Sequence, residues 1–199
     1  MSTSVFSTDP VVEIHTTEPV YKLIDPFSSE RLIFRTLLES DFPAYHTILK
    51  EEETMTLAGA GPMLDKDRAL GWFRMTQEFT RYGLFLKKSD GTEGELVGEG
   101  GVFKINNRFP EIYYLIKQDF WGKGYASEFV RSFMDIWWNL PRKKTRFFVN
   151  TVFLDSQDTY EAKERLCAPI SEKNIISQRV VEKIGFKYLK KVYMEEEKE

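Results

Sequence analysis

The sequence predicts an α/β (α+β) fold in which a mixed sheet is flanked by helices. Short apolar or alternating runs typical of strands recur along the chain, and amphipathic stretches with helical spacing separate them. Glycine, proline and Asp-Gly pairs divide the two kinds of segment. Because no repeat or internal linker interrupts this alternation, one sheet with helices packed on it is the expected architecture.

The predicted order of elements is β-α-α-β-β-β-α-β-α-β. The expected strands are 30–37, 84–88, 95–105, 112–116, 145–154 and 186–194. The expected helices are 39–53, 64–83, 125–140 and 172–186. In the third of these helices apolar residues recur at intervals of three and four, which indicates one buried face.

Capping residues predict where the helices begin and end. Ser40 or Asp41 is expected to cap the first helix, with Pro43 in its first turn. Gly83 is expected to stop the second helix, and Gly185 the last one.

Several segments are expected to lie outside the core of the domain. Residues 1–28 form an N-terminal arm, in which VVEIHTT and VYKLI are predicted to add edge strands, and 195–199 form an acidic tail. The polar segment 155–173 is interpreted as an insertion with its own short helix. Strands 112–116 and 146–154 are expected to form a parallel pair through a right-handed crossover.

Composition excludes several classes of function. With 28 Lys and Arg against 31 Asp and Glu, the formal charge of -3 argues against general affinity for nucleic acid or anionic membranes. Cys167 cannot form an internal disulfide, and with only His15 and His46 it makes a metal site improbable. The first residues show no secretory signal and no apolar window spans a bilayer, so a cytoplasmic location is expected.

The stretch DFWGKGYASEFV places Gly122 and Gly124 where a strand gives way to a helix. The first N–H groups of a helix have no carbonyl partner, so such a junction can hold an anion, with Lys123 adding charge. A tight turn that needs positive φ is the alternative. A P-loop requires Ser or Thr where Tyr125 stands, and the dinucleotide fingerprint fails at Ser127.

The longer stretch EIYYLIKQDFWGKGYASEFV resembles the acetyl-CoA motif of the GNAT superfamily of N-acetyltransferases. It is most similar to the branch of ribosomal-protein N-terminal (alanine/serine) acetyltransferases. The family pattern Q/R-x-x-G-x-G/A aligns with residues 121–126, with Trp121 at the first position. SERLIFRTLLESDF and NIISQRVVEKIGF resemble the family's opening and closing segments, which gives an N-acetyltransferase domain over 29–194.

The resemblance implies a mostly antiparallel sheet with a splayed parallel strand pair, here 112–116 and 146–151. A V-shaped slot between these strands would take the pantetheine arm of acetyl-CoA, and main-chain N–H groups of 121–126 its diphosphate. The implied cofactor-binding residues are Leu115, Ile116, Trp121, Gly122, Lys123, Gly124, Tyr125, Ala126 and Asn174.

The implied reaction is direct attack of a primary amine on acetyl-CoA in a ternary complex. The amine would be a protein N-terminus, an amino sugar or a small metabolite. A main-chain N–H near Leu115 or Ile116 is the candidate oxyanion donor. Val181 stands where many relatives carry a tyrosine acid, so Ser177 is the candidate acid; a helix cap is its alternative role.

Three further residues are candidates at the site. Glu99 is the candidate base, with the glycines around it indicating close approach of a ligand or a bulge; a solvent-facing glutamate is the alternative. Asn150 lines the slot or is a satisfied core amide. Tyr113 replaces a family glycine beside the slot and is assigned to substrate binding. Residues 51–53 attract a cationic amine or form a solvated acidic turn.

One departure from the family pattern leaves other functions open. A strand that relatives have after GF is expected to be missing, and the N-terminal arm or a second subunit to replace it. The protein is therefore either an active enzyme, as monomer or homodimer, or an idle acyl-CoA-binding module. A nucleotide-binding protein that uses the glycine loop is the third interpretation.

Overall fold

The computed structural model describes residues 10–20, 25–75, 80–104, 106–155 and 160–192. Its strands are β1 (Val11–Pro19), β2 (Phe27–Ser28), β3 (Leu32–Arg35), β4 (Thr80–Lys87), β5 (Glu93–Phe103), β6 (Glu111–Ile116) and β7 (Arg142–Asn150). Its helices are α1 (Phe42–Leu49), α2 (Glu52–Leu57), α3 (Lys66–Met75), α4 (Tyr125–Asn139) and α5 (Ile175–Ile184). Short 3-10 turns occur at Glu39–Asp41, Gln118–Phe120 and Thr151–Phe153.

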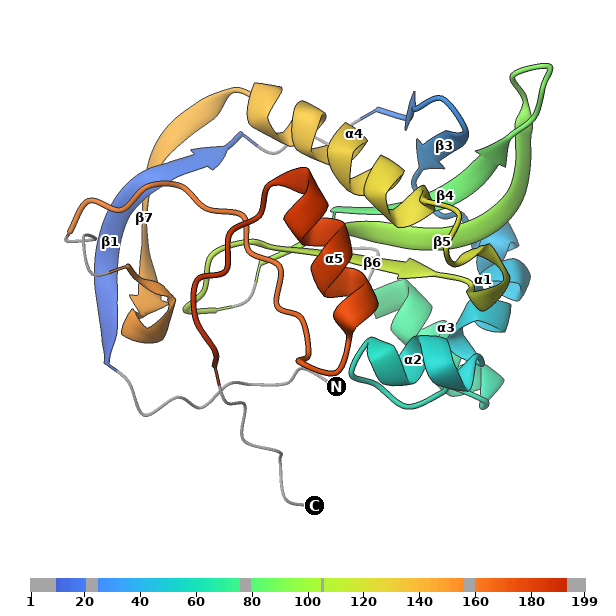
Figure 1. The fold of residues 1–199 in the computed structure, drawn as a ribbon, viewed down its shortest axis with the longest axis horizontal. Coiled ribbons are helices and arrows are strands. Elements are labelled where there is room, and N and C mark those ends of the chain that lie inside the picture. The colour runs from blue at the N-terminus through green and yellow to red at the C-terminus, as the bar shows by residue number, and fades with distance from the viewer. Residues whose placement is uncertain (1–9, 21–24, 76–79, 105, 156–159, 193–199) are drawn as a thin grey trace.

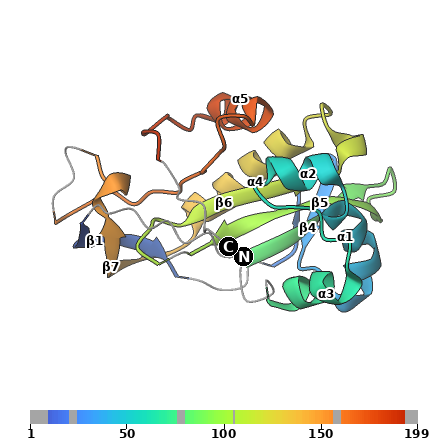
Figure 2. The ribbon, with the colours of Figure 1, turned by 90° about the horizontal axis from the view of Figure 1, so that it is seen from below.

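The main sheet is antiparallel throughout, with the strand order β2-β3-β4-β5-β6. Figure 1 shows α4 and α5 in front of this sheet, and Figure 2 shows α1 and α3 on its opposite side. The predicted fold class, a mostly antiparallel sheet flanked by helices, is confirmed.

An apolar cluster fills each side of the sheet. On the α4 side, Phe129, Phe133 and Trp137 are fully buried at intervals of four residues, as the sequence spacing predicts. On the other side, Tyr45 of α1 and Phe73 of α3 are fully buried and their ring centroids lie 5.5 Å apart. Both helical layers are therefore fixed to the sheet by aromatic packing.

The glycines of β5 permit close packing within the protein itself. A Cβ added to Gly100 would lie 2.2 Å from the Phe129 ring of α4. A Cβ added to Gly101 would lie 1.9 Å from the carbonyl oxygen of Thr80 in β4. The close approach that the sequence indicated is thus made by a helix and a neighbouring strand.

The same strand contains a β-bulge. Leu84 pairs with Gly98, but its neighbour Phe85 pairs with Leu96, so Val97 is an extra residue on β5. The bulge changes which face of the sheet the following side chains occupy.

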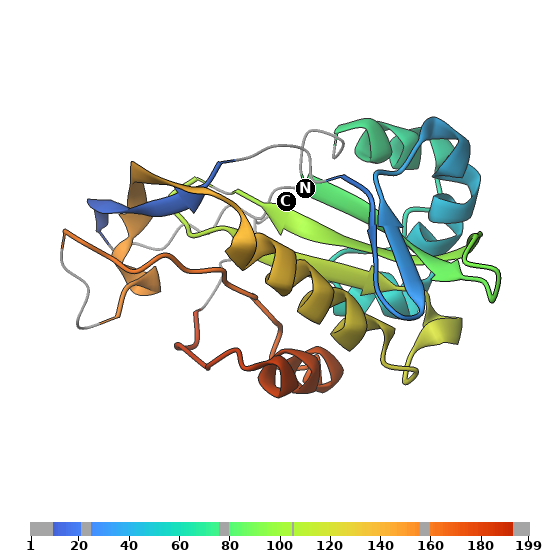
Figure 3. The same ribbon diagram turned by 90° about the horizontal axis from the view of Figure 1, so that it is seen from above.

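The N-terminal segment forms a second sheet with β7. β1 and β7 pair antiparallel along nine residues, from Val11 opposite Asn150 to Pro19 opposite Arg142. Figure 3 shows this pair at one end of the main sheet. A small core with Ile14 at its centre stabilises the pair. The N-terminal arm therefore supplies a strand beside β7.

The expected hydrogen-bonded parallel pair of 112–116 with 146–154 is wrong: β6 and β7 belong to different sheets. At its start, the edge of β6 is taken by the segment after β7. Ile112 N donates to Cys167 O at 2.8 Å, and Cys167 N donates to Pro110 O at 2.9 Å. β7 pairs instead with β1, so β6 and β7 are not hydrogen-bonded to each other.

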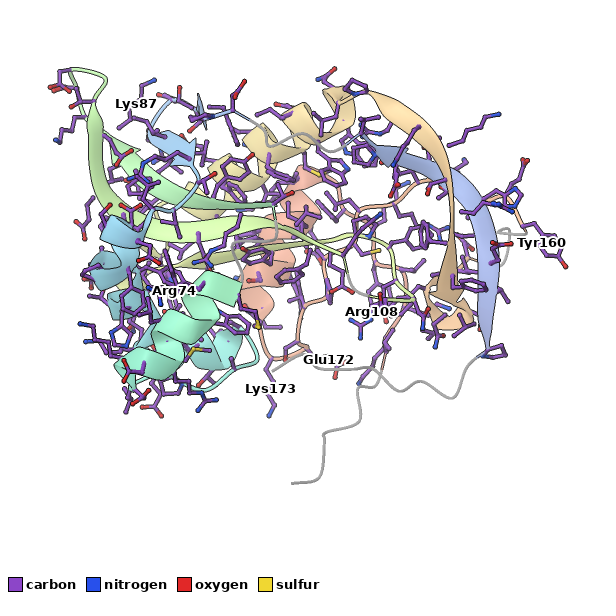
Figure 4. The ribbon with its side chains drawn as sticks, turned by 180° about the vertical axis from the view of Figure 1, so that it is seen from behind. Arg74, Lys87, Arg108, Tyr160, Glu172 and Lys173 are labelled. Carbon is purple, nitrogen blue, oxygen red and sulfur yellow. The ribbon has the colours of Figure 1, made fainter. Side chains whose placement is uncertain are left out.

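The insertion has no helix in its described part, residues 160–173. It runs extended between the two sheets, because His15 N donates to Tyr160 O at 2.6 Å and Cys167 bonds to the start of β6. Figure 4 shows the Tyr160 side chain pointing away from the molecule, consistent with an exposed fraction of 79%.

Boundaries differ from the prediction at other places too. Gly83 does not end a helix but lies inside β4, where an added Cβ would meet Leu37 at 2.5 Å. The strand expected at 186–194 is absent from residues 186–192, and helix α2 was not predicted. Most of VYKLI lies outside the described residues.

The predicted stop of α5 is confirmed, whereas Asp41 occupies the N-cap position of α1 without a capping hydrogen bond, because its side chain accepts from Leu38 N and Arg35 instead. Asp41 precedes α1, which has Pro43 in its first turn, and α5 ends at Gly185 with φ 104°. Left-handed backbone at that position favours glycine.

The packing of the insertion on β6 predicts an unreactive thiol. Burial, with Glu111 nearby, raises the pKa of Cys167 to about 11. We expect alkylation of the native protein by iodoacetamide at pH 8 to be at least about 100-fold slower than in urea, because few thiolates are present. Cys167→Ser is the blank. Because folding favours the protonated thiol, the free energy of unfolding should fall as the pH rises from the pKa of the unfolded thiol, near 8.5, towards 11. Native labelling within tenfold of the unfolded rate would contradict this.

Candidate active site

The edge of β6 that faces away from β5 has backbone groups available for a ligand. Lys117 N donates to Val97 O, and Leu115 pairs with Glu99 across the antiparallel ladder. Because backbone direction alternates along a strand, Leu115 points its N–H into the ladder, whereas Tyr114 and Ile116 point theirs to the outer edge.

The loop from β6 to α4 depends on left-handed glycines. Gly122 has φ 72° and Gly124, the N-cap of α4, has φ 84°. A Cβ added to Gly122 would meet nothing within 4 Å, so its requirement is one of backbone angle and the space beside it is open. The positive φ that one interpretation of the sequence required is therefore observed, and it is compatible with the other interpretation, an anion-binding loop.

This loop leaves a row of backbone donors without acceptors. Among the described residues, no backbone hydrogen bond is donated by the N–H groups of residues 122–126. The first helical bond is donated by Glu128 N to Gly124 O at 3.0 Å. The donors lie at the positive end of a 15-residue helix, which is an arrangement suited to a phosphate or diphosphate.

Trp121 fixes the start of the loop to the end of β6. Its indole Nε1 donates to Ile116 O at 2.6 Å, and its ring packs against the α4-side core. The carbonyl of Ile116 is therefore occupied, while the N–H of the same residue still faces the outer edge.

The first turn of α5 lies over β6. Asn174 caps this helix by accepting from Ser177 N at 3.0 Å, and its Nδ2 donates to Leu57 O at 3.1 Å. The hydroxyl of Tyr114 donates to Ser177 O at 3.3 Å. The structure thus brings Ser177 close to β6, but it commits both amide atoms of Asn174 to the fold. The sequence prediction missed Tyr114, which follows Tyr113 and points to the opposite face.

Glu99 lies on the α1 side of the sheet and is 5% exposed, so the solvent-facing alternative is wrong. Tyr45 donates to its Oε1 at 2.9 Å, and Arg81 Nε lies 2.6 Å from its Oε2. Burial raises the pKa of the Glu99 carboxyl, and Arg81 opposes this shift. The bulge at Val97 turns Glu99 to this side, a feature that alternation in the sequence does not reveal.

Tyr113 and Asn150 lie apart from the glycine loop. The Tyr113 ring stacks on Phe103 with centroids 4.4 Å apart, and burial raises its pKa well above the ordinary phenol value. Asn150 Oδ1 accepts from Val152 N at 2.9 Å at the far end of β7. In this bond the Asn150 amide oxygen caps the turn that follows β7.

Two of the acidic residues after α1, Glu52 and Glu53, line an open hollow of about 370 Å³ together with Thr56 and Leu57. Glu51 Oε2 accepts from Gln118 N at 2.8 Å, so α2 is joined to the loop that precedes α4. Figure 4 places Glu172 and Lys173, in the turn before α5, on the rim of the molecule.

The described residues hold neither a cluster of metal ligands nor a membrane-spanning helix. They contain no group of three or more His, Cys, Asp or Glu residues that could hold a metal ion. None of their helices is both long and apolar enough to cross a bilayer.

Solved structures of acetyltransferases share this fold. An acetyltransferase from Agrobacterium tumefaciens is 24% identical, with 84% of this chain and 86% of that chain covered and a TM-score of 0.59. A GNAT-family acetyltransferase from Bacillus anthracis is 20% identical, covers 80% and 82%, and has a TM-score of 0.58. A spermidine N-acetyltransferase from Vibrio cholerae, solved with CoA and spermine, is 15% identical, covers 79% and 81%, and has a TM-score of 0.55.

The family model described as "Acetyltransferase (GNAT) domain" matches residues 31–187, which include the open edge of β6, the glycine loop and the start of α5. Members of this family are acyltransferases that use acetyl-CoA. This chain belongs to the GNAT acetyltransferase family.

Proposed function

We propose that this protein transfers the acetyl group of acetyl-CoA to a primary amine within a ternary complex. The observation that supports this most directly is the row of unpaired N–H groups at residues 122–126, next to the outer edge of β6. The donors fit a diphosphate, and the edge fits the amide-containing arm that continues from it.

The reaction needs four contributions from the protein. The amine nitrogen attacks the thioester carbonyl carbon, the C–S bond breaks, the amine loses a proton and the departing thiolate gains one. Holding both reactants together supplies much of the rate. The remaining contributions are a donor for the oxyanion, an acid for sulfur and a base for nitrogen.

The oxyanion donor we propose is the N–H of Ile116. The sequence left Leu115 and Ile116 as alternatives, but the N–H of Leu115 points into the ladder with Glu99. Ile116 points its N–H to the outer edge, and Trp121 holds its carbonyl in place.

The acid we propose is Ser177, which lies over β6 in the first turn of α5. Ser177→Ala should lower kcat about 10- to 100-fold and leave the KM for acetyl-CoA unchanged, since the hydroxyl acts on the departing sulfur. Initial rates at several acetyl-CoA concentrations measure both constants, with Ser171→Ala, in the turn before α5, as the control. Unchanged kcat in a folded variant would assign Ser177 to the fold alone.

The base we propose is Glu99, acting from a buried position. Its raised pKa, caused by burial, suits a carboxylate that accepts the proton of an ammonium group. Its partners Tyr45 and Arg81 mean that removal of the carboxylate also disturbs the fold.

Glu99→Ala should lower the free energy of unfolding by about 3–5 kcal/mol, because Arg81 is left as an uncompensated buried charge. The double variant Arg81→Met/Glu99→Leu replaces the pair with apolar side chains and should recover most of that loss. Urea denaturation of the wild type and both variants measures it. Equal destabilisation of both variants would contradict the ion-pair account.

The same double variant tests the base. If Glu99 takes the ammonium proton, kcat falls at least about 100-fold while CoA still binds. Wild-type turnover in the folded double variant would assign the pair to the fold alone.

For the acceptor, the sequence motifs favour the branch of ribosomal-protein N-terminal acetyltransferases, so peptides with a free N-terminal alanine or serine are the first to test. Spermidine is a second, in view of the Vibrio cholerae structure. The idle-module alternative is favoured by one observation: Asn174, the implied cofactor contact, has both amide atoms committed within the protein.

Binding of CoA separates these alternatives and tests the glycine loop. CoA at 100 times its Kd should stabilise the protein by about 2.7 kcal/mol, whereas ATP and NAD should not. Gly122→Ala should weaken CoA binding. Gly91 also has a positive φ, 83°, and open space beside it, so Gly91→Ala is the control: it should lose similar stability but keep its affinity for CoA. Acetyl transfer to any amine then excludes the idle module. Absence of CoA stabilisation in the wild type would overturn the proposed function.

A further inference from the structure

This inference rests on the proposed function and concerns the turn between β2 and β3. From the geometry around Arg31, we infer that this residue is a positioning residue for the diphosphate of acetyl-CoA, acting by holding Glu128 and the Lys123 carbonyl away from the loop donors.

Arg31 contacts the loop and the first turn of α4 at once. Its Nε and Nη2 each lie 2.7 Å from Glu128 Oε2, and its Nη1 donates to Lys123 O at 3.0 Å. Its guanidinium carbon lies 4.7 Å from the centroid of the Tyr125 ring. A single side chain thus joins three consecutive parts of the diphosphate-binding segment.

Glu128 is held on all sides by the same turn. Its Oε1 accepts from the Arg31 backbone N at 2.8 Å and from Ser29 Oγ at 2.6 Å. Although burial works against it, these bonds hold the pKa of Glu128 below its ordinary value. The residue is therefore a carboxylate that lies one turn from the proposed diphosphate.

A carboxylate at this position would oppose the ligand if it were free. It could accept hydrogen bonds from the unpaired N–H groups of the first turn, and its charge would repel the diphosphate. The Arg31 pair neutralises that charge and directs the carboxylate toward β3. The bond from Arg31 Nη1 occupies the carbonyl oxygen of Lys123, so this acceptor is already paired.

The closeness of Arg31 to the loop also depends on glycine. A Cβ added to Gly124 would lie 3.4 Å from Arg31 Nη2, which is ordinary van der Waals contact. The guanidinium therefore lies directly against the N-cap of α4. Arg31 is the arginine of the SERLIF stretch, which the sequence pattern explains only as part of a strand. The contact with the N-cap of α4 gives this arginine a physical role.

A truncated acetyl donor tests the inference. Arg31→Met should raise the KM for acetyl-CoA about tenfold, with kcat within twofold, because an uncompensated Glu128 then lies beside the diphosphate. Kinetic constants for S-acetylpantetheine, which lacks the diphosphate, should be unchanged within twofold. Calorimetry with CoA supplies a readout independent of turnover.

Arg35 gives a matched control. It lies at the end of β3, the strand that Arg31 immediately precedes, and forms equally close ion pairs, with Asp41 at 2.6 Å and Glu93 at 2.7 Å, but neither partner belongs to the loop. Arg35→Met should lower the melting temperature without changing the KM for acetyl-CoA. Arg31→Lys, which keeps the charge but not the forked geometry, covers the case in which Arg31→Met does not fold, and should raise that KM about threefold.

Adding Glu128→Gln to Arg31→Met should return the KM for acetyl-CoA to within about threefold of wild type, because the repelling charge is gone. Equal effects on acetyl-CoA and S-acetylpantetheine, or an Arg31→Met phenotype equal to that of Arg35→Met, would overturn the inference. If the wild type binds CoA but Arg31→Met binds it equally well, this inference fails while the proposed function stands.

Discussion

The position of the first turn of α4 is the constraint on which the rest of the site depends. α4 can approach the sheet closely because Gly100 leaves room for the Phe129 ring, and its N-terminal loop can turn because Gly122 and Gly124 adopt left-handed angles. Neither feature works alone. If α4 packed on the sheet without the left-handed turn, the N–H donors of the loop would be buried. If the turn formed without that packing, the donors would have no fixed position relative to β6.

The separation of β6 from β7 follows from how each strand satisfies its backbone. A strand with no partner is unfavourable, and β1 pairs with one edge of β7 along its whole length. The segment around Cys167 does the same for the start of β6. The part of the β6 edge near Ile116 has no such strand beside it in the described sheets, and it adjoins the glycine loop. A ligand can therefore continue from the loop along this edge.

Local signals predicted the elements whose causes are local. The aromatic spacing of α4, the start of α1 after Asp41 and the glycine stop at Gly185 depend on neighbours within one or two turns, and all are observed. The environment of Glu99 was not predictable, because it depends on a bulge and on Arg81, 18 positions earlier in the sequence. The partner of β7 was predicted wrongly for the same reason. Both β1 and β6 are suitable partners by sequence, and tertiary packing decides between them.

The buried pair of Arg81 and Glu99 is best understood through the elements it orients. Such pairs add little net stability relative to apolar side chains, so stability alone does not account for it. Glu99 holds the hydroxyl of Tyr45 and thereby the rotation of α1 over β5. Helix α2 follows α1 directly, and Glu51 at its N-cap accepts from Gln118 N, where the loop before α4 begins. The ion pair on one face of the sheet is thus connected, through α1 and α2, to the loop on which the unpaired donors lie.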